Sequence, residues 1–246
     1  MKNAALIFLL LIGCTATATP GSRLLAVKAK AMSAGYTADL KALSEAAGDA
    51  RAIAAADPKL AALAHYWAGY ALWQSAVNDV NLNLDPAADR AAALVEFDAA
   101  IAARENFADA HALAAWLHGW LYAADPANKD AHQQALIKHL TRARELEPDN
   151  PRVLWEGAYV LQFRDNARAR RILDDLTSRP DTANAQSPDP DWGLPEALML
   201  ASYNQLNNDP VDVAAAEKLA RRAQELRPGW HYVEKILMPQ IAAKKQ

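Results

Sequence analysis

The fold of this chain is decided by a stretch that occurs twice: ALIKHLTRARELEP at residues 135–148 and AAEKLARRAQELRP at residues 215–228. Both copies carry Ala, Lys, Arg-Ala, Glu-Leu and a closing Pro in the same order, 80 positions apart. In the first copy Leu136, Leu140 and Ala143 return every three or four residues, which is the spacing of one face of a helix. The stretch therefore predicts an amphipathic helix, and its recurrence predicts an array of helix pairs of about 40 residues each.

Pairs of an acidic or amide residue followed by proline separate the apolar stretches. They begin at Asp57, Asp85, Asp125, Asn150 and Asp209. The first residue accepts a hydrogen bond from an unpaired N–H group of the first helical turn, and proline has no N–H group that needs a partner there. Each pair predicts a helix start, and Leu194-Pro195, with Asp191 as its cap, predicts another. The expected helix pairs are residues 22–34 with 37–56, 58–76 with 86–104, 108–124 with 128–146, 151–164 with 166–178, and 194–206 with 210–226, followed by a last helix from about residue 230.

The composition agrees with helices and excludes several classes of protein. Roughly a quarter of the 246 residues are alanine, 52% are hydrophobic and only 9 are glycine. This composition argues against a β-sandwich, a barrel or a disordered chain. The formal net charge of −3 gives no reason to expect a nucleic acid as partner. The single cysteine excludes internal disulfides and a cysteine-rich zinc site. We expect an all-α fold with a single repeat domain over residues 19–246.

The helix pairs resemble tetratricopeptide repeats (TPR). In that family small residues let the two helices of a unit approach closely, bulky residues flank them, and a proline closes the second helix. The matching residues are Ala93, Phe97 and Ala100 in a second helix, and Leu154, Gly157, Ala158 and Leu161 in a first helix. The resemblance implies a right-handed α-solenoid of about five antiparallel helix pairs, with the segment from Gly229 and Trp230 onward as a C-terminal capping helix.

The resemblance also implies a binding surface, because the first helices of TPR units line a concave face that receives the partner. The inward positions carried over from the family hold mostly aromatic side chains, which together with arginine are the usual anchors of binding surfaces. They are Trp67, Trp73, Trp116, Trp120, Arg152, Trp155, Tyr159, Gln162, Phe163, Glu196, Met199, Tyr203 and Asn207. Large aromatic residues at helical spacing are also common in protein cores, so about half of this set is expected to pack inside the protein. Trp116, Trp155 and Tyr159 are the strongest groove candidates, and Arg152 alone is too little positive charge to clamp a peptide carboxylate.

Candidate metal-ligating histidines have the wrong spacing for a site on one helix. His111 and His118 stand seven residues apart, as do His132 and His139, which is over 10 Å along a helix at about 1.5 Å per residue. Two imidazoles on one helix share an ion only at a spacing of three or four residues. These histidines are expected to be packed or solvated, and they could meet only across a helix pair.

The segment DVNLNLD at residues 79–85 begins like a calcium loop, but Leu84 replaces the turn glycine and Arg90 replaces the bidentate glutamate. We expect Val80, Leu82 and Leu84 to fill a gap between helices instead.

The acidic, proline-rich residues 188–192 are expected to be a stiff linker. No Gly-rich phosphate loop, Gly-x-Ser-x-Gly motif or Cys/His nucleophile pair occurs. The chain is therefore expected to be non-enzymatic, without a cofactor or bound metal.

Residues 1–18 have the features of an export signal. Lys2 precedes an apolar run at residues 4–12, which is far shorter than the ~20 residues that span a bilayer. LIGC at residues 11–14 resembles a lipoprotein lipobox, with cleavage before Cys14 and lipidation of that cysteine, whereas ATA at residues 16–18 fits ordinary cleavage after Ala18. Lipidation is favoured and implies an outer-membrane lipoprotein that faces the periplasm; the alternative is a soluble periplasmic protein.

Together these features favour a non-enzymatic adaptor of the bacterial envelope that binds an envelope protein or peptide through its concave aromatic groove. A second interpretation is a receptor for a small apolar or amphipathic molecule, as TPR lipoproteins linked to solute transporters are thought to be. The 7 tryptophans, without a matching basic clamp, favour that alternative. A third is an oligomeric structural element, because a solenoid exposes its terminal apolar faces unless they are capped. In every case membrane contact is expected only through the N-terminal lipid anchor.

Overall fold

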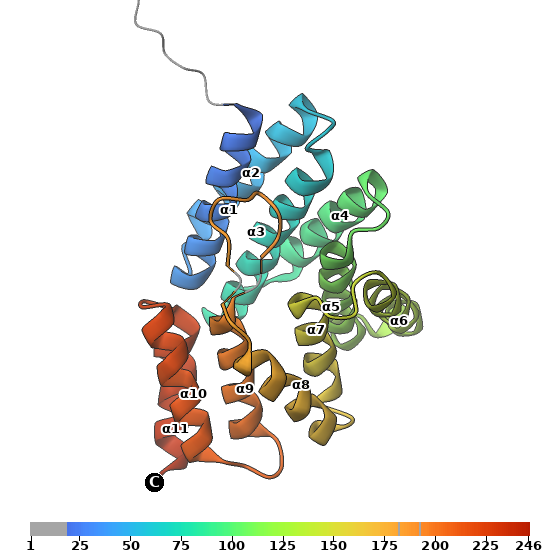
Figure 1. Ribbon diagram of the computed structural model, residues 1–246. Helices are drawn as coiled ribbons and strands as arrows, with labels where there is room; N and C mark the ends of the chain where they lie inside the picture. Colours follow the sequence, from blue (N-terminus) through green and yellow to red (C-terminus); the bar gives the residue numbers. More distant parts are fainter. Residues whose placement is uncertain (1–18, 182, 192) are drawn as a thin grey trace, which may run out of the picture.

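The computed structural model describes residues 19–246 except residues 182 and 192, and this part of the chain forms eleven α-helices (Figure 1). They are α1 (Pro20–Thr37), α2 (Leu40–Ala56), α3 (Ala61–Asn81), α4 (Ala87–Ala103), α5 (Ala108–Ala124), α6 (Lys129–Leu146), α7 (Pro151–Leu161), α8 (Asn166–Ser178), α9 (Leu194–Asn207), α10 (Val213–Leu226) and α11 (Met238–Lys244). A 3₁₀ turn, η1 (Pro126–Asn128), precedes α6, and a π-helical turn, η2 (Val233–Leu237), precedes α11. No strand occurs among the described residues. The prediction of an all-α fold is confirmed.

Helices that are neighbours in the sequence pack against each other. The expected pairs α1 with α2, α3 with α4, α5 with α6, α7 with α8 and α9 with α10 all form, and contacts of α2 with α3, α4 with α5 and α8 with α9 join successive pairs. Both η2 and α11 pack on α10, at the place where the C-terminal cap is expected. The chain is therefore a repeat-like array of helix pairs, compatible with the TPR-like organisation inferred from the sequence.

Not every Asp-Pro or Asn-Pro sequence stands at the start of a helix. Asn150-Pro151 does: α7 begins at Pro151, and the Asn150 side chain accepts a hydrogen bond of 2.8 Å from the Arg152 amide. The predicted start at Asp57 is wrong, because the Asp57 carboxylate accepts from the Lys59 amide in a turn and α3 begins only at Ala61.

The predicted start at Asp209-Pro210 is also wrong. Asp212 caps α10 instead by accepting a 2.9 Å hydrogen bond from the Ala215 amide. Asp125 caps the 3₁₀ turn η1 rather than α6 itself. The cap of α9 is Gly193 and not Asp191. A short polar side chain before proline thus predicts a turn reliably, but the helix can begin a few residues later.

The small residues of the TPR-like pattern allow helices to approach closely. Ala93, Phe97 and Ala100 of α4 are all fully buried. The Phe97 ring lies against Gly69 of α3, where an added Cβ atom would come within 2.9 Å of the ring. A side chain larger than glycine at residue 69 would therefore push α3 and α4 apart.

The array curls until its two ends meet. In Figure 1 the chain turns from α1 through α5 and α7 to α10 and α11, which lie beside the end of α1. Tyr36, near the C-terminal end of α1, meets Trp230 edge to face with 5.0 Å between ring centroids, and it packs on the C-terminal apolar cluster. This closure brings side chains of the first and last helices to one central region.

The turn between α3 and α4 differs from expectation. Val80, Leu82 and Leu84 are 45%, 37% and 52% exposed, so the prediction that they fill a gap between helices is wrong. The reason is that α3 continues through Val80 to Asn81, and the tight turn that follows carries Leu82 and Leu84 to the outside.

Residues 1–18, with the predicted cleavage sites and Cys14, lie outside the described residues. Among the residues that are described, no helix is long and apolar enough to cross a membrane.

Candidate ligand-binding pocket

A pocket of about 250 Å³ lies where the closed array brings the inner sides of α1, α3, α5, α7 and α9 together with the segment after α10. Aromatic side chains dominate its lining. They are Tyr36, Tyr70, Trp73, Trp116, Trp120, Trp155, Tyr159, Tyr203, Trp230 and Tyr232. For comparison, a dry cavity of about 150 Å³ is enough to bind benzene. The pocket therefore has room for a small organic molecule.

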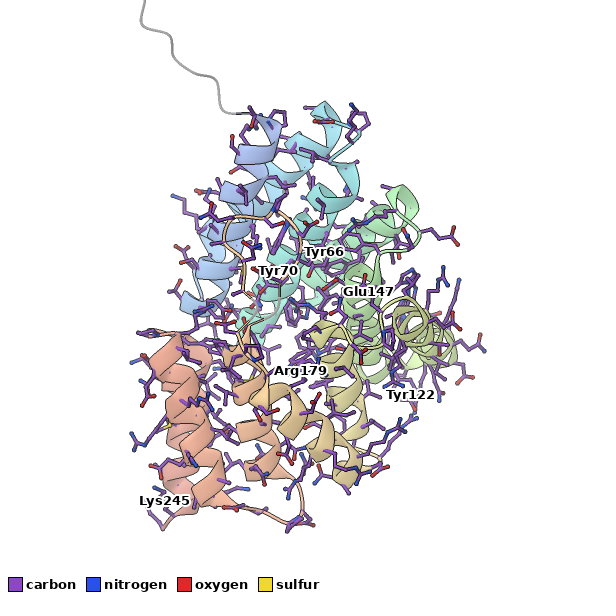
Figure 2. All side chains as sticks on the ribbon, viewed as in Figure 1. Tyr66, Tyr70, Tyr122, Glu147, Arg179 and Lys245 are labelled. Atoms are coloured by element: carbon purple, nitrogen blue, oxygen red, sulfur yellow. The ribbon has the colours of Figure 1, made fainter. Side chains whose placement is uncertain are left out.

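Contacts among the rings fix the shape of the pocket. Trp116 lies edge-on to Trp73 at 5.5 Å and to Trp120 at 4.4 Å between centroids. Trp155 and Tyr159 stack with 5.9 Å between centroids and 13° between planes. Tyr70 lies on the inner side of α3, whereas side chains such as Tyr122 and Lys245 lie at the periphery (Figure 2). Most rings of the lining are held by another ring, so the pocket is largely preformed.

Most of the inward positions inferred from the sequence reach this pocket. Those that line it are Trp73, Trp116, Trp120, Arg152, Trp155, Tyr159, Glu196, Met199 and Tyr203. Trp67 does not, since it is fully buried beneath the loop described below. Phe163 is 66% exposed at the C-terminal end of α7 and lies outside the lining, as do Gln162 and Asn207.

Four aromatic lining residues were not inferred as groove positions: Tyr36, Tyr70, Trp230 and Tyr232. Tyr36, Trp230 and Tyr232 reach the pocket because α1 meets the C-terminal segment, and no local pattern encodes that closure. Tyr70 could have been inferred from the sequence, because it stands in the same aromatic stretch as Trp67 and Trp73.

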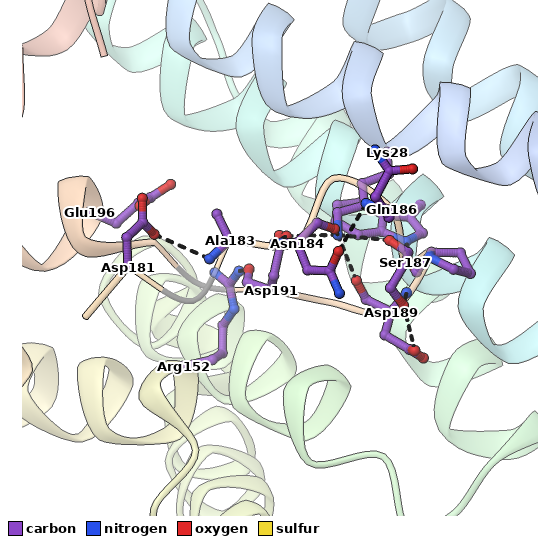
Figure 3. Close-up of polar contacts among 12 residues, drawn as sticks. Lys28, Arg152, Asp181, Ala183, Asn184, Gln186, Ser187, Asp189, Asp191 and Glu196 are labelled. Carbon is purple, nitrogen blue, oxygen red and sulfur yellow. Dashed lines mark hydrogen bonds and ion pairs between the residues drawn. The ribbon is translucent and has the colours of Figure 1, made fainter. Parts of the chain in front are cut away.

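The loop between α8 and α9, described at residues 179–181, 183–191 and 193, lies against α1, α3 and α7 beside the pocket. Lys28 of α1 and Arg152 of α7 reach it from opposite sides (Figure 3). Lys28 Nζ donates to the carbonyl oxygens of Asn184, Ser187 and Asp189, each at 2.9 Å, and to Asp191 Oδ2 at 2.8 Å. Within the expected stiff linker, Pro188, Asp189 and Asp191 are thus tied to the helices, the latter two through a buried ammonium group.

Trp67 and Arg152 complete the attachment of this loop. The Trp67 indole N–H donates to the Pro188 carbonyl oxygen at 2.7 Å. The Arg152 guanidinium donates to the Asp191 carbonyl oxygen at 3.4 Å and lies 3.7 Å from Asp109 Oδ1. Trp67 therefore has a structural role at the loop rather than a place in the pocket.

Arg152 is a fully buried cation whose charge is compensated. Burial alone lowers its pKa, but Tyr66, Tyr70 and the carboxylates of Asp109 and Asp191 outweigh burial, so the pKa of Arg152 is raised. Burial raises the pKa of the Asp109 carboxyl group, and the Arg152 guanidinium acts against that rise. The guanidinium is thus part of the scaffold that holds α5, α7 and the loop together.

Glu196 is the acidic residue that lines the pocket, and its carboxyl group is only half satisfied. It stands in the first turn of α9 and is 9% exposed. Its Oε1 accepts a hydrogen bond from the Tyr36 hydroxyl, whereas its Oε2 has no hydrogen-bond partner among the described residues. Burial raises the pKa of Glu196 to about 7, against the opposing effects of the nearby backbone amides and of Arg227. A group of this kind, in a pocket, marks a candidate functional site.

Donors on the other side of the pocket also lack acceptors. The indole N–H groups of Trp73 and Trp116 are buried and have no partner in the described part of the chain. Burial raises the pKa of Tyr159 to about 12, so its hydroxyl stays protonated at neutral pH. The pocket combines aromatic surface with a few polar atoms that a ligand can satisfy.

A row of four histidines lies outside the pocket, between α5 and α6. His111 Nδ1 lies 2.9 Å from His139 Nδ1, and His118 Nδ1 lies 3.1 Å from His132 Nδ1. The rings of His118 and His139 stack at 5.7 Å and join the two pairs into one row. These histidines do meet across the helix pair, which their spacing in the sequence left open. In the described ranges no three His, Cys, Asp or Glu side chains are placed to hold a metal ion.

Comparison with known proteins adds no assignment. No protein-family model, no curated protein and no solved structure matches this chain.

Proposed function

We propose that this protein is a receptor for a small molecule that binds in the central aromatic pocket. The proposal is carried by one observation: beside the loop that follows α8, the inner sides of the helices enclose a partly open, aromatic-lined pocket of about 250 Å³. That volume suits a small molecule with an apolar body. The role is non-enzymatic and needs no cofactor.

Native mass spectrometry of the protein, purified without denaturation from the cells that make it, tests this proposal. We expect a discrete added mass on the wild type. Met199→Trp places a larger side chain in the lining and should remove the added mass, whereas Phe163→Trp, outside the pocket, should retain it. If the wild-type protein carries no added mass and binds no compound from an extract of its host, the receptor proposal is wrong.

A second candidate function is the adaptor that binds an envelope protein or peptide. The observation that favours it lies at the end of α3 and in the turn that follows, where Val80, Leu82 and Leu84 present exposed apolar side chains. Val80 is also part of the pocket lining. Singly exposed apolar residues are common, but a group of them beside a pocket is typical of a contact surface.

In-cell photocrosslinking distinguishes the adaptor from the receptor. A photoreactive amino acid at Leu84 should capture one specific envelope protein, and the same amino acid at Val95, which is 65% exposed on α4, should not. Loss of the adduct in the Trp155→Ala/Tyr159→Ala double variant would place the contact at the pocket. Equal capture from both positions would count against the adaptor.

We further propose export to the bacterial envelope, with lipidation at Cys14 and an outer-membrane location facing the periplasm, on the basis of the apolar run and lipobox-like residues near the N-terminus. Membrane fractionation of the wild type and Cys14→Ser tests it, since only the wild type should sediment with membranes.

We also propose a more specific architecture for the array of helix pairs: the two helices of each pair are antiparallel, and the pairs form a right-handed TPR superhelix. It is supported by the repeat at residues 135–148 and 215–228 and by the small residues at the helix crossings.

A further inference from the structure

Resting on the proposed receptor function, we propose that the ligand of the central pocket is an aromatic amine in its protonated form, with its ammonium group at Glu196 and its ring among the tryptophan side chains. The class is defined by three properties of the pocket: its size, its charge and the nature of its surface.

The size of the pocket suits a ligand part of about ten non-hydrogen atoms, because a cavity of about 150 Å³ holds benzene and this pocket has about 250 Å³. One six-membered ring with a short side chain matches that number. A lipid or a folded peptide segment is too large to be enclosed.

The charges around the pocket favour a cation. Arg152 and Glu196 are the charged residues of the lining. Arg152 is already balanced by the carboxylates of Asp109 and Asp191. Glu196 has the Tyr36 hydroxyl on one oxygen and no hydrogen-bond partner for the other among the described residues. The Arg227 guanidinium, 5.7 Å from the Tyr36 ring centroid, acts on Glu196 only from a distance and forms no ion pair with it in the described part of the chain. The uncompensated charge of the lining is therefore negative.

The surface of the pocket favours a cation as well. The faces of indole and phenol rings attract an ammonium or guanidinium group through their quadrupole, and more strongly where water is excluded. One ring of this lining already binds a cation in this way: the Arg90 guanidinium lies 3.4 Å from the Trp120 ring centroid. An ammonium group near Glu196 would lie close to the Tyr36 ring, which contacts Trp230, and the apolar ring of the ligand would replace water against Trp116 and Trp155.

A matched pair of probes tests the charge preference directly. Phenethylamine and 2-phenylethanol have the same shape, and only the first carries a positive charge. We expect phenethylamine to bind the wild-type protein about tenfold more tightly than 2-phenylethanol, as measured by tryptophan fluorescence and calorimetry at pH 8. Glu196→Gln should reduce phenethylamine affinity about tenfold and leave 2-phenylethanol within about twofold. Glu145→Gln, at an exposed carboxylate of α6, should change neither affinity.

The pH dependence gives a second readout. Phenethylamine affinity for the wild type should rise between pH 6 and pH 8 as Glu196 ionises, and it should be flat in Glu196→Gln. Ionisable groups near Glu196 that could contribute are Tyr36 from α1, Asp181 from the loop and Arg227 after α10. Circular dichroism establishes that each variant is folded.

The outcomes separate the two proposals. Equal binding of the amine and the alcohol, or an unchanged amine affinity in Glu196→Gln, would overturn the cation assignment and leave the receptor intact. Binding of neither probe would overturn it too, and native mass spectrometry then decides separately whether any small molecule is held.

Discussion

Lys28 and Glu196 are two buried ionisable residues on the inner side of the same array, and their surroundings are opposite. The Lys28 ammonium has four oxygen partners from the loop of residues 179–193. The Glu196 carboxyl group has one partner, the Tyr36 hydroxyl, and an oxygen with none among the described residues. The region around Lys28 is thus filled by the chain itself, whereas the region around Glu196 borders the pocket.

This difference shows how a structural site can be told from a binding site. A buried charge is tolerated when its hydrogen-bonding capacity is filled, and the Lys28 region meets that condition without any ligand. A buried carboxyl group with an unfilled oxygen costs stability and persists where function requires it. Removing Lys28 should therefore destabilise the protein, whereas neutralising Glu196 should stabilise it.

The largest effect is expected for Lys28→Met. The substitution removes the buried ammonium group that pairs with Asp191 and joins three carbonyl oxygens of the loop, and Asp191 keeps only the Asn184 amide as a donor to the same oxygen. Breaking this buried pair should cost about 3–5 kcal/mol of unfolding free energy. Urea denaturation measures this loss, and limited proteolysis should show cleavage within residues 179–193. The control is Lys30→Met on the same helix: Lys30 forms exposed ion pairs with Glu45 and Asp49, and its loss should cost under about 1 kcal/mol. Equal effects of the two substitutions would show that the loop is not anchored by Lys28.

Glu196→Gln, in contrast, is expected to increase the free energy of unfolding. The folded-state pKa of Glu196 is about 7, above its ordinary value of 4.5, so the folded protein keeps a proton that the unfolded chain has released. Stability from this group is present below the unfolded pKa and is lost as the pH rises through 7. Since glutamine does not titrate, the variant should be more stable than wild type by about 1–3 kcal/mol at pH 8 and nearly equal at pH 5. Burial also raises the pKa of Glu156 well above its usual range, and that contribution is common to both proteins.

Urea denaturation at the two pH values measures the difference. A variant less stable than wild type at pH 8 would mean that the Glu196 carboxylate is stabilised by its surroundings, and the contrast with Lys28 would disappear.

The histidine row supplies a comparison at acid pH. Burial, followed by the charges of His111, His118 and Lys138, lowers the pKa of His139 to about 4. Because the unfolded chain takes up protons below its pKa of about 6.5 and the folded chain resists them, stability is complete above pH 6.5 and is lost as the pH falls toward 4. His139 is partly solvated, so we expect a loss of about 1–2 kcal/mol between pH 7 and pH 4.5.

His139→Gln should reduce that loss, and His231→Gln, outside the row, should not. Chemical denaturation at the two pH values compares the variants. An acid sensitivity that is the same in all three proteins would place its origin in groups other than the row.

The sequence predicted the helices and their pairing well because both are local. Alanine-rich stretches with apolar residues at three- and four-residue spacing, such as Leu136, Leu140 and Ala143, form helices wherever they pack. Errors arose at turns: Asp57 and Asp209 stand before prolines but three or more residues before the next helix, since the same side chain that caps a helix also stabilises a turn.

The sequence indicated only those pocket-lining residues whose inward position follows from the pattern of a single helix. Trp116, Trp155 and Tyr159 were found from their positions on first helices. Tyr36 and Trp230 could not be found, because their proximity depends on how far the whole array curls, a sum of small rotations at every helix crossing. The loop that covers Trp67 was equally hidden, because its contacts join residues more than 120 positions apart in the sequence, as in the hydrogen bond from Trp67 to Pro188.

The smallest expected effect separates two tryptophans of α3. Trp67→Phe and Trp73→Phe remove the same atoms from buried positions, but the Trp67 N–H group donates to the Pro188 carbonyl oxygen and the Trp73 N–H group has no acceptor among the described residues. The lost volume is the same, so the difference between the two variants reports the contacts of Trp67 with the loop: its hydrogen bond to Pro188 and the Lys28 ammonium group 5.6 Å from its ring centroid. We expect Trp67→Phe to be less stable than Trp73→Phe by about 1–2 kcal/mol, because the Pro188 carbonyl is left unpaired. Thermal and urea unfolding provide the measurement. Equal stability, or a larger loss in Trp73→Phe, would mean that the Trp73 N–H group is satisfied in solution, and the pocket would then lack one of the polar atoms that a ligand is expected to meet.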